Sequence, residues 1–255
     1  MLTSRYWLKV TKLEIWDSDL PTEFDGFKIV HLSDLHGEEF GKGNSRLLEE
    51  VEAQKPDIIV LTGDFLDDDT DADDNAELIK ALPLIAQTYY VSGNHDVVSE
   101  DFDKFVSMLE ENGIRFLRGE YELLERAEAQ IAVAGIEDPT TWGEITKATE
   151  LVDIMLEDGI ECFTVMLAHR NYWVELEPDL KVDIILCGHA HGGIIRLPFI
   201  GGLLGTDRTL FPDYVDGVTQ TDEYSMVVSR GLGNSIGIPR FLNRPEIISI
   251  ELKTK

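Results

Sequence analysis

The sequence predicts an α/β fold in a single domain, residues 1–255, built as two halves that each contribute a sheet. In the first half, short apolar and β-branched runs alternate with segments of helical spacing, which indicates a largely parallel sheet buried on both faces. After Gly113 the pattern changes to short strands with turns, and further apolar runs extend to the end of the chain. No linker rich in Pro, Gly or Ser separates the halves, which favours one domain over two.

The first half contains three expected strands and three expected helices. The strands are "FKIVHLSD", "DIIVLTGD" and "TYYVSGNHD", at 27–34, 57–64 and 88–96. The expected helices are residues 44–55, which stop before Pro56, residues 75–86, interrupted at Pro83, and residues 99–113, with Ser99 as N-cap and Gly113 as stop.

The second half begins with short strands and turns over residues 114–138 and continues with a helix over residues 144–159. The remaining apolar runs are expected strands, at 163–169, 182–191, 223–229 and 246–253.

Composition limits the kind of partner. The 49 acidic residues outnumber the 22 basic ones and give a formal net charge of −27. Such a chain is repelled by the phosphate backbone, so long nucleic acids are not expected as substrates.

Cys162 and Cys187 lie in apolar segments and are interpreted as buried thiols in a reducing compartment. No stretch reaches the roughly 20 apolar residues that span a bilayer, so the expected location is cytoplasmic. The acidic run at 67–74 is interpreted as a solvated loop.

Polar residues that can carry chemistry follow five of the apolar runs. The sequence has six histidines, and five of them stand at these strand ends, whereas His31 lies inside a strand and is interpreted as a core residue. Ligands of parallel α/β sheets bind beyond the carboxyl ends of the strands, so the strand-end residues are expected to converge. They are Asp34, His36, Asp64, Asn94, His95, His169, His189 and His191.

The types of these residues indicate two metal ions. They combine oxygen and imidazole donors without cysteine, which suits Mn, Fe, Zn, Co or Ni and excludes a thiolate zinc finger or an all-oxygen calcium site. A carboxylate can bridge two such ions, which two-metal hydrolases hold about 3.5–4 Å apart. Gly63, Gly93 and Gly188 permit tight turns with positive φ and a close approach of the backbone to a ligand.

The motifs "SDLH", "TGD", "SGNHD", "LAH" and "CGHAHGG" occur in the order that is typical of the calcineurin-like metallophosphoesterases, and the sequence resembles that family over nearly its whole length. Segments before and after the motifs resemble its bacterial YkuE/YaeI-type branch. The resemblance implies a four-layer α/β/β/α sandwich, the metallo-dependent phosphatase fold, with two central mixed sheets. It also implies a ligand set for each ion: Asp34, His36 and His191 for one, Asn94, His169 and His189 for the other, and Asp64 as the bridge.

The same resemblance implies a dinuclear hydrolase of phosphoester bonds, with a hydroxide that bridges the two ions as nucleophile. His95 is expected to protonate the leaving oxygen. Asp96 either orients His95 and raises its pKa or only closes the turn. Arg170 and Arg196 either clamp a phosphate or form structural ion pairs.

A phosphodiesterase is the expected activity. A phosphomonoesterase, including a protein phosphatase, and a metal-bound interaction scaffold without turnover are the alternatives. The expected partner is a small phosphoester, with a nucleotide or a nucleotide-linked lipid among the candidates. The apolar, glycine-rich loop "PFIGGLLG" at 198–205 is expected to shape the substrate pocket, to contact a lipid tail, or simply to pack.

Overall fold

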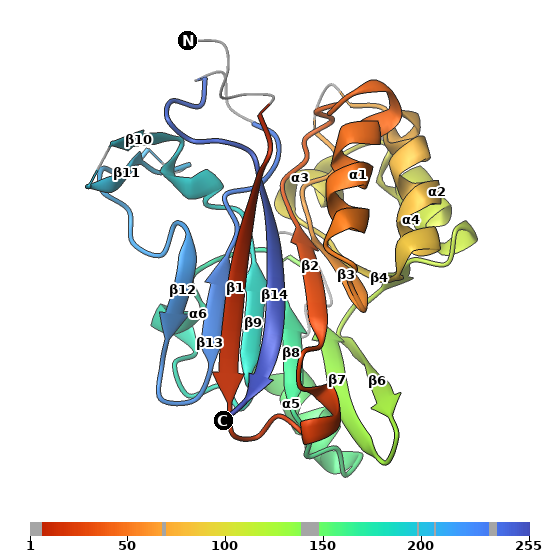
Figure 1. The fold of residues 1–255 in the computed structure, drawn as a ribbon. Coiled ribbons are helices and arrows are strands. Elements are labelled where there is room, and N and C mark those ends of the chain that lie inside the picture. The colour runs from red at the N-terminus through yellow and green to blue at the C-terminus, as the bar shows by residue number, and fades with distance from the viewer. Residues whose placement is uncertain (1–6, 68–69, 139–147, 198, 207, 235–238) are drawn as a thin grey trace.

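Two six-stranded sheets stand face to face in the computed structural model of the chain (Figure 1). The structure describes residues 7–67, 70–138, 148–197, 199–206, 208–234 and 239–255.

In the first sheet the strand order is β1-β14-β2-β3-β4-β5. All neighbours are parallel except β14 and β2, so the sheet is mixed. The bounds are β1 Lys9–Asp17, β14 Glu246–Thr254, β2 Lys28–Leu32, β3 Ile58–Thr62, β4 Gln87–Val91 and β5 Arg115–Phe116.

In the second sheet the strand order is β12-β13-β9-β8-β7-β6, with parallel strands in the centre and one antiparallel strand at each edge. The bounds are β12 Gly217–Gln220, β13 Ser225–Val228, β9 Ile184–Cys187, β8 Thr164–Leu167, β7 Ala129–Gly135 and β6 Glu120–Arg126.

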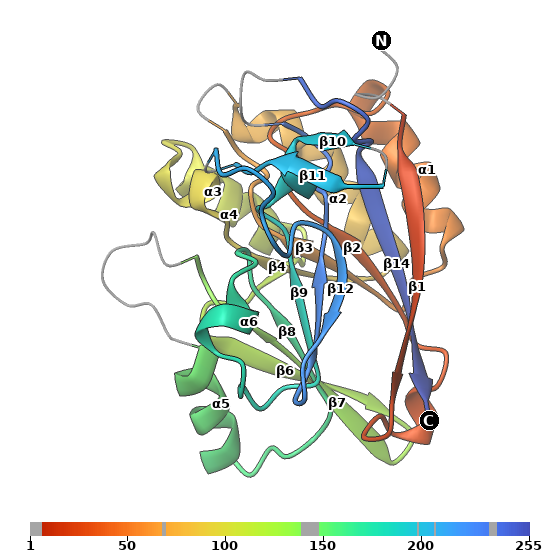
Figure 2. The ribbon, with the colours of Figure 1, turned by 90° about the vertical axis from the view of Figure 1, so that its left-hand side faces the viewer.

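The layers follow from where the apolar side chains meet. Inward-facing residues of both sheets form one core between them, including Val60 of β3 and Val165 of β8. The outer face of the first sheet packs against α1 (Ser45–Ala53), α2 (Ala76–Ile85) and α4 (Phe102–Glu111), and that of the second against α5 (Ala148–Glu157) and α6 (Trp173–Leu176). The α/β/β/α sandwich with two mixed sheets is therefore confirmed (Figures 1 and 2).

The two sheets do not correspond to two halves of the sequence, and that expectation is corrected. Strand β14, from the last part of the chain, lies inside the first sheet, with β1 on one side and β2 on the other. Its residues Ile248 and Ile250 face the core between the sheets, which explains why an apolar run so late in the chain joins the first sheet.

Two expectations about local structure are corrected as well. Helix α2 runs through Pro83 to Ile85, because buried Ile79 and Leu82 hold the last turn against the sheet. Ser99 does not cap the helix of residues 102–111. It ends a short helix, α3 (Asn94–Val98), that directly follows β4. Part of the helix expected at 144–159 lies outside the described residues; α5 forms the rest.

A small hairpin, β10 (Ile195–Leu197) paired with β11 (Gly201–Leu204), stands apart from both sheets (Figure 2). Within the described residues, no helix is long and apolar enough to cross a membrane. Both cysteines are free. Cys187 is buried and Cys162 partly buried.

Three carboxylates meet at the end of the fold where β1 stops and β9 starts. Oxygen atoms of Asp17, Asp19 and Asp183 lie within 4.8 Å of one another. Burial, and then the two neighbouring carboxylates, raise the pKa of Asp183 to about 6, although its side chain accepts a 2.7 Å hydrogen bond from the Thr164 N–H. The folded chain therefore holds this proton more tightly than the unfolded chain, whose Asp has an ordinary pKa of 3.8.

A pH-dependent stability follows from Asp183. Because the folded-state pKa is the higher one, this stabilisation is present at low pH and is lost as the pH rises from about 4 to about 6. Asp183→Asn should therefore raise the free energy of unfolding at pH 7 by about 2 kcal/mol and should change it little at pH 4. Urea unfolding at both pH values measures this, with Asp153→Asn as the control for loss of one exposed charge outside the cluster. An equal effect at both pH values would contradict the assignment.

Candidate active site

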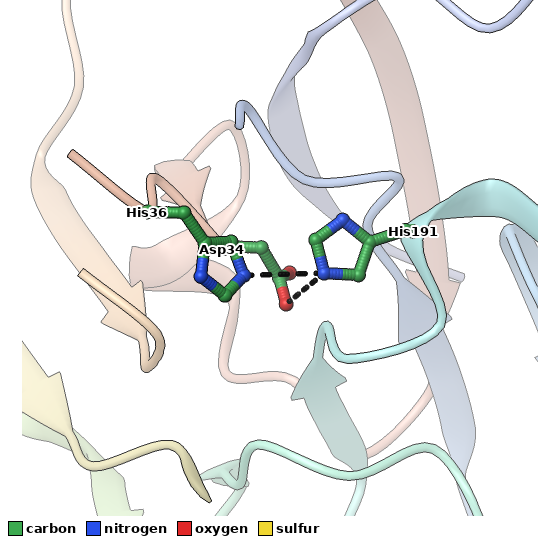
Figure 3. Close-up of side chains that lie close together, drawn as sticks. All are labelled: Asp34, His36 and His191. Atoms are coloured by element: carbon green, nitrogen blue, oxygen red, sulfur yellow. Dashed lines mark hydrogen bonds and ion pairs between the residues drawn. The ribbon is translucent and has the colours of Figure 1, made fainter. Parts of the chain in front are cut away.

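The strand-end residues come together where the sheets present the carboxyl ends of their parallel strands. Asp34 and His36 follow β2, and His189 and His191 follow β9 in the opposite sheet. His36 Nε2 and His191 Nε2 are 3.2 Å apart, and His191 Nε2 lies 3.5 Å from Asp34 Oδ1 (Figure 3). One ligand atom from each of Asp34, His36 and His191 lies within 4.8 Å of the others, so these three side chains form a first cluster.

A second cluster consists of Asp64, His169 and His189. His169 Nε2 lies 3.1 Å from Asp64 Oδ2 and 3.2 Å from His189 Nδ1. The opposite nitrogen, Nδ1 of His169, lies 2.7 Å from the Thr62 carbonyl oxygen, to which it can donate. That hydrogen bond fixes the ring orientation and leaves Nε2 facing the cluster, as in metal-ligating histidines.

Asp64 connects the two clusters. Its Oδ2 atom lies 3.1 Å from His169 Nε2 in the second cluster and 3.7 Å from His36 Nε2 in the first. Its other oxygen, Oδ1, accepts a 2.8 Å hydrogen bond from the His95 N–H, which fixes the carboxylate in this position. One carboxylate oxygen therefore faces ligands of both clusters, the arrangement that a bridging ligand needs.

Asn94 begins helix α3, directly after Gly93, and its Oδ1 atom is buried without a hydrogen-bond partner among the described residues. A buried acceptor without a partner costs about 1–3 kcal/mol, so native proteins rarely keep one without a reason. A metal ion is a suitable partner for this oxygen. The oxygen and imidazole donors of the two clusters, together with this unpartnered oxygen, fit a pair of divalent ions.

The backbone of the site is strained at several of the expected ligands. Non-glycine residues rarely adopt positive φ, and each such residue costs on the order of 1–3 kcal/mol. Five of the seven expected metal ligands do so, with φ values of 52° for Asp34, 48° for His36, 57° for Asp64, 66° for His189 and 48° for His191. Strain of this kind concentrates at functional sites, where the surrounding structure holds the residues in place.

Two glycines make the close packing possible. A Cβ atom at Gly93 would collide with Asp64, and one at Gly188 would collide with Ser33 and Asp34. The positive φ expected at all three glycines is present at Gly63 alone. Glycine is required at positions 93 and 188 because a side chain would not fit there, not because the backbone has a positive φ.

Burial and neighbouring charges set the protonation of the histidines in the two clusters. Burial lowers the pKa of His189 to about 3 and that of His191 well below its ordinary value, so both rings are neutral and can offer a lone pair. Burial alone would lower the pKa of His169, but Asp64 and then Asp34 raise it to about 10. The same contact with His169 keeps the pKa of Asp64 below its ordinary value despite burial. His169 therefore carries a proton at the position that a metal ion would take.

His95 lies beside the clusters. Its ring stands edge-on to that of His36, with ring centroids 4.9 Å apart, and its Nδ1 lies 3.0 Å from Asp67 Oδ1. The hydrogen bond to Asp67 raises the pKa of His95, against the opposing effect of burial. The other oxygen of Asp67 lies 3.4 Å from His36 Nδ1, so one carboxylate supports both histidines.

The partner of His95 is thus Asp67, not Asp96. Both oxygens of Asp96 are fully occupied by the turn: they accept five hydrogen bonds, four from backbone N–H groups and one from a phenol. The structure therefore favours the turn-closing alternative for Asp96. The donors are the N–H groups of Asp64, Phe65, Leu66 and Gly93 and the hydroxyl of Tyr90.

Asp96→Asn tests this structural role. Burial raises the pKa of Asp96, but the N–H donors favour the carboxylate, and an amide in its place would direct an NH₂ group at some of them. The free energy of unfolding should fall by on the order of 3 kcal/mol. Tyr90→Phe removes only one of the five hydrogen bonds and should cost about 1 kcal/mol. Chemical denaturation of both variants measures the difference, and equal losses would contradict the central role of Asp96.

The acidic run at 67–74 is only in part the solvated loop that the composition suggests. Asp67, its first residue, is half-buried beside His36 and His95. Asp71 caps the short helix of residues 72–75 and pairs with Lys104. Residues 68 and 69 lie outside the described residues. In the sequence, only its position three residues after Asp64 could have indicated that Asp67 contacts the site histidines.

The two arginines suggested for phosphate binding differ in their surroundings. Arg170 forms a bidentate pair with buried Asp138, through Nε–Oδ2 at 2.8 Å and Nη2–Oδ1 at 3.2 Å, and lines a pocket next to His189. Arg196 donates from Nη1 to Asp216 Oδ1 at 2.8 Å and to a backbone carbonyl, and does not line that pocket. The structure therefore favours the structural alternative for Arg196 and keeps Arg170 as a candidate.

Two further neighbours of the site, Asp138 and Arg240, follow no motif that would have marked them in the sequence. Arg240 is buried, its Nη2 atom lies 3.2 Å from His191 Nδ1, and burial lowers its pKa to about 10. His31, in contrast, is confirmed as a core residue: it is fully buried and bonded to Thr62, and burial lowers its pKa to about 3.

The pocket next to His189 has a volume of about 490 Å³. Arg170 and Tyr172 line it together with the segment 209–215, which includes Phe211 and Tyr214. Its walls combine one cation, Arg170, and two carboxylates, Glu175 and Asp213, with aromatic and aliphatic surface. A pocket of this composition can hold an organic group beside a charged one.

Comparisons with known proteins agree with this geometry. A family model described as calcineurin-like phosphoesterase matches residues 27–193. YkuE of Bacillus subtilis, an uncharacterized metallophosphoesterase, is 28% identical over 258 residues, which cover 97% of this chain and 86% of that protein. Phosphodiesterase YaeI of Escherichia coli is 30% identical over 234 residues, which cover 89% of this chain and 82% of that protein.

Among solved structures, TT1561 of Thermus thermophilus is similar with a TM-score of 0.55 at 13% identity, over 81% of this chain and 90% of that one, which shows the fold alone. The sandwich fold, the adjoining Asp/His clusters and the relatives together define a metal-dependent phosphoester hydrolase. The chain belongs to the calcineurin-like phosphoesterases, a family whose members hold a dinuclear divalent metal site.

Proposed function

We propose that the protein is a phosphodiesterase that uses two divalent ions, with His95 as the general acid. The observation that carries the proposal is the position of Asp64 between two Asp/His clusters, with His95 beside them. We assign Asp34, His36 and His191 to one ion, Asn94, His169 and His189 to the other, and Asp64 to both. Bound there, the ions would activate the attacking water and neutralise charge on the phosphoryl oxygens.

The role of His95 rests on its two ring nitrogens. Nδ1 donates to Asp67, and no described residue hydrogen-bonds to Nε2. Because the hydrogen bond to Asp67 favours the protonated ring, Nε2 carries a proton that it can give to the oxygen of the departing alcohol. In this role Asp67 is a positioning residue: it fixes the ring orientation and does not itself reach the substrate.

A diester is favoured over a monoester because the site has room for a second ester group. The pocket of about 490 Å³ adjoins His189, and Arg170, fixed by Asp138, can face a phosphoryl oxygen at its entrance. The name of the relative YaeI supports the same choice.

We further propose that residues 1–255 act as one domain, which the apolar core shared by both sheets supports. A cytoplasmic location is also proposed, and the two free cysteines support it.

Hydrolysis of aryl phosphates by the metal-loaded protein tests the proposal. We expect loss of turnover after chelation, recovery with Mn²⁺, and faster hydrolysis of bis(4-nitrophenyl) phosphate than of 4-nitrophenyl phosphate. Faster hydrolysis of the monoester would overturn the diester preference. Two bound ions per chain without turnover on either ester would instead indicate a scaffold.

A further inference from the structure

Six large exposed apolar side chains lie on three segments whose backbones contact one another near the site. They are Phe199, Ile200, Leu210, Phe211, Phe241 and Leu242, and we call them the apolar rim. They account for six of the fourteen exposed large hydrophobic side chains of the described residues. Single exposed apolar residues are normal on protein surfaces, but a group of this size marks an interface.

Backbone contacts hold the three segments of the apolar rim together. Ile195 and Phe241 form a β-bridge, and so do Leu204 and Leu210. The Phe211 N–H donates to the Leu203 carbonyl at 3.0 Å. The hairpin β10–β11, which carries Phe199 and Ile200, stands outside the two sheets in both ribbon views (Figures 1 and 2). The three segments that carry the rim are therefore joined to one another, and the hairpin among them projects from the two sheets.

The charge around the apolar rim is opposite to that of the rest of the chain. Residues 193–216 and 229–245, which carry the rim, include five arginines and three aspartates, a formal charge of +2 in a chain whose formal net charge is −27. Arg208 is exposed, and Arg244 stacks 4.3 Å above the ring of Trp7, which is itself exposed. Asp213 is an exposed acid near the pocket side of the rim. A negatively charged surface would repel most of the protein electrostatically but would not repel this end.

We infer that the apolar rim docks the protein on an anionic phospholipid bilayer. Phe199 and Ile200 enter the boundary between headgroups and acyl chains, where aromatic and aliphatic side chains gain from burial. Exposed Arg208 and half-buried Arg244 face the anionic headgroups. Leu210 and Phe211 belong both to the rim and to the wall of the pocket. Docking in this orientation therefore turns the mouth of the pocket toward the membrane surface.

Co-sedimentation with vesicles tests the inference, using phosphatidylcholine alone and phosphatidylcholine mixed equally with phosphatidylglycerol. The unchanged protein should sediment with the mixed vesicles and much less with the neutral ones. The double variant Phe199→Ser/Ile200→Ser should reduce the partition coefficient by about tenfold to a hundredfold. The matched control, Leu84→Ser/Leu176→Ser, removes two exposed leucines elsewhere and should bind as the unchanged protein does.

Hydrolysis of a soluble aryl diester, measured on the same samples, should be equal for all three proteins, because neither Phe199 nor Ile200 lines the pocket. This assay tests the proposed function separately from docking. Three results would overturn the inference: no sedimentation with either vesicle, equal sedimentation with both, or equal loss in the control. Self-association that the double variant abolishes, without vesicle binding, would also overturn it and would assign the apolar rim to a second copy of the chain.

Discussion

His95→Ala is expected to lower kcat for phosphodiester hydrolysis by about 10²–10⁴-fold while both metal ions remain bound. The imidazole lies beside the clusters but belongs to neither metal set: Nδ1 is held by Asp67 at 3.0 Å, and its ring contacts His36 only edge-on. Removing it should therefore remove the proton donor and leave the ligands in place. Steady-state kinetics together with metal analysis of the dialysed variant measure both quantities.

The leaving group makes this experiment more specific. A general acid matters most when the departing oxygen is basic, so the loss should be larger for a phenyl ester than for a 4-nitrophenyl ester. Asp67→Asn keeps the ring but weakens its orientation and protonation, and should show a smaller loss with the same dependence on the leaving group. Equal losses for both esters, or a parallel loss of metal, would overturn the assignment of His95 as the acid.

Asp64→Ala is expected to reduce the bound metal from two ions to one or none and to lower kcat by on the order of 10³-fold or more. A single oxygen of Asp64 lies 3.7 Å from His36 Nε2 and 3.1 Å from His169 Nε2, so its removal takes away the carboxylate oxygen that faces both clusters. Its removal should also leave the positive charge on His169 without its main partner and so lower the pKa of that ring.

Metal content by mass spectrometry and turnover at saturating Mn²⁺ measure the effect of Asp64→Ala. Asp179→Asn, which removes an exposed acid away from the site, is the control for net charge. Two ions retained per chain with only a small loss of turnover would show that Asp64 does not bridge them.

The positions of the site residues could be predicted because they depend on chain direction alone. Each of Asp34, Asp64, Asn94 and His169 closely follows a short buried strand, and parallel strands bring their carboxyl ends to one edge. Which carboxylate contacts His95 depends instead on side-chain direction. Asp96 is adjacent to His95 in sequence but faces the turn, whereas Asp67, on another loop, faces the imidazole.

Long-range strand pairing was also beyond prediction. Strand β1 alternates half-buried and exposed residues and lies at the edge of the sheet, so its sequence lacks the continuous apolar run that marks the central strands. The hairpin β10–β11 could not be predicted because its glycines and apolar residues are equally compatible with a packed loop.

The place of β14 has a consequence for biosynthesis. This strand pairs with β1 over Lys9 to Asp17 and with β2 over Lys28 to His31, so it separates two strands that are made near the start of translation. Until residues 246–254 have left the ribosome, β1 has no partner in the sheet and β2 has one open edge. An open strand edge in a nascent chain is a site for aggregation, and pairings between residues so distant in sequence form slowly. The sheet that positions Asp34 and His36 is therefore completed only when residues 246–254 have been made.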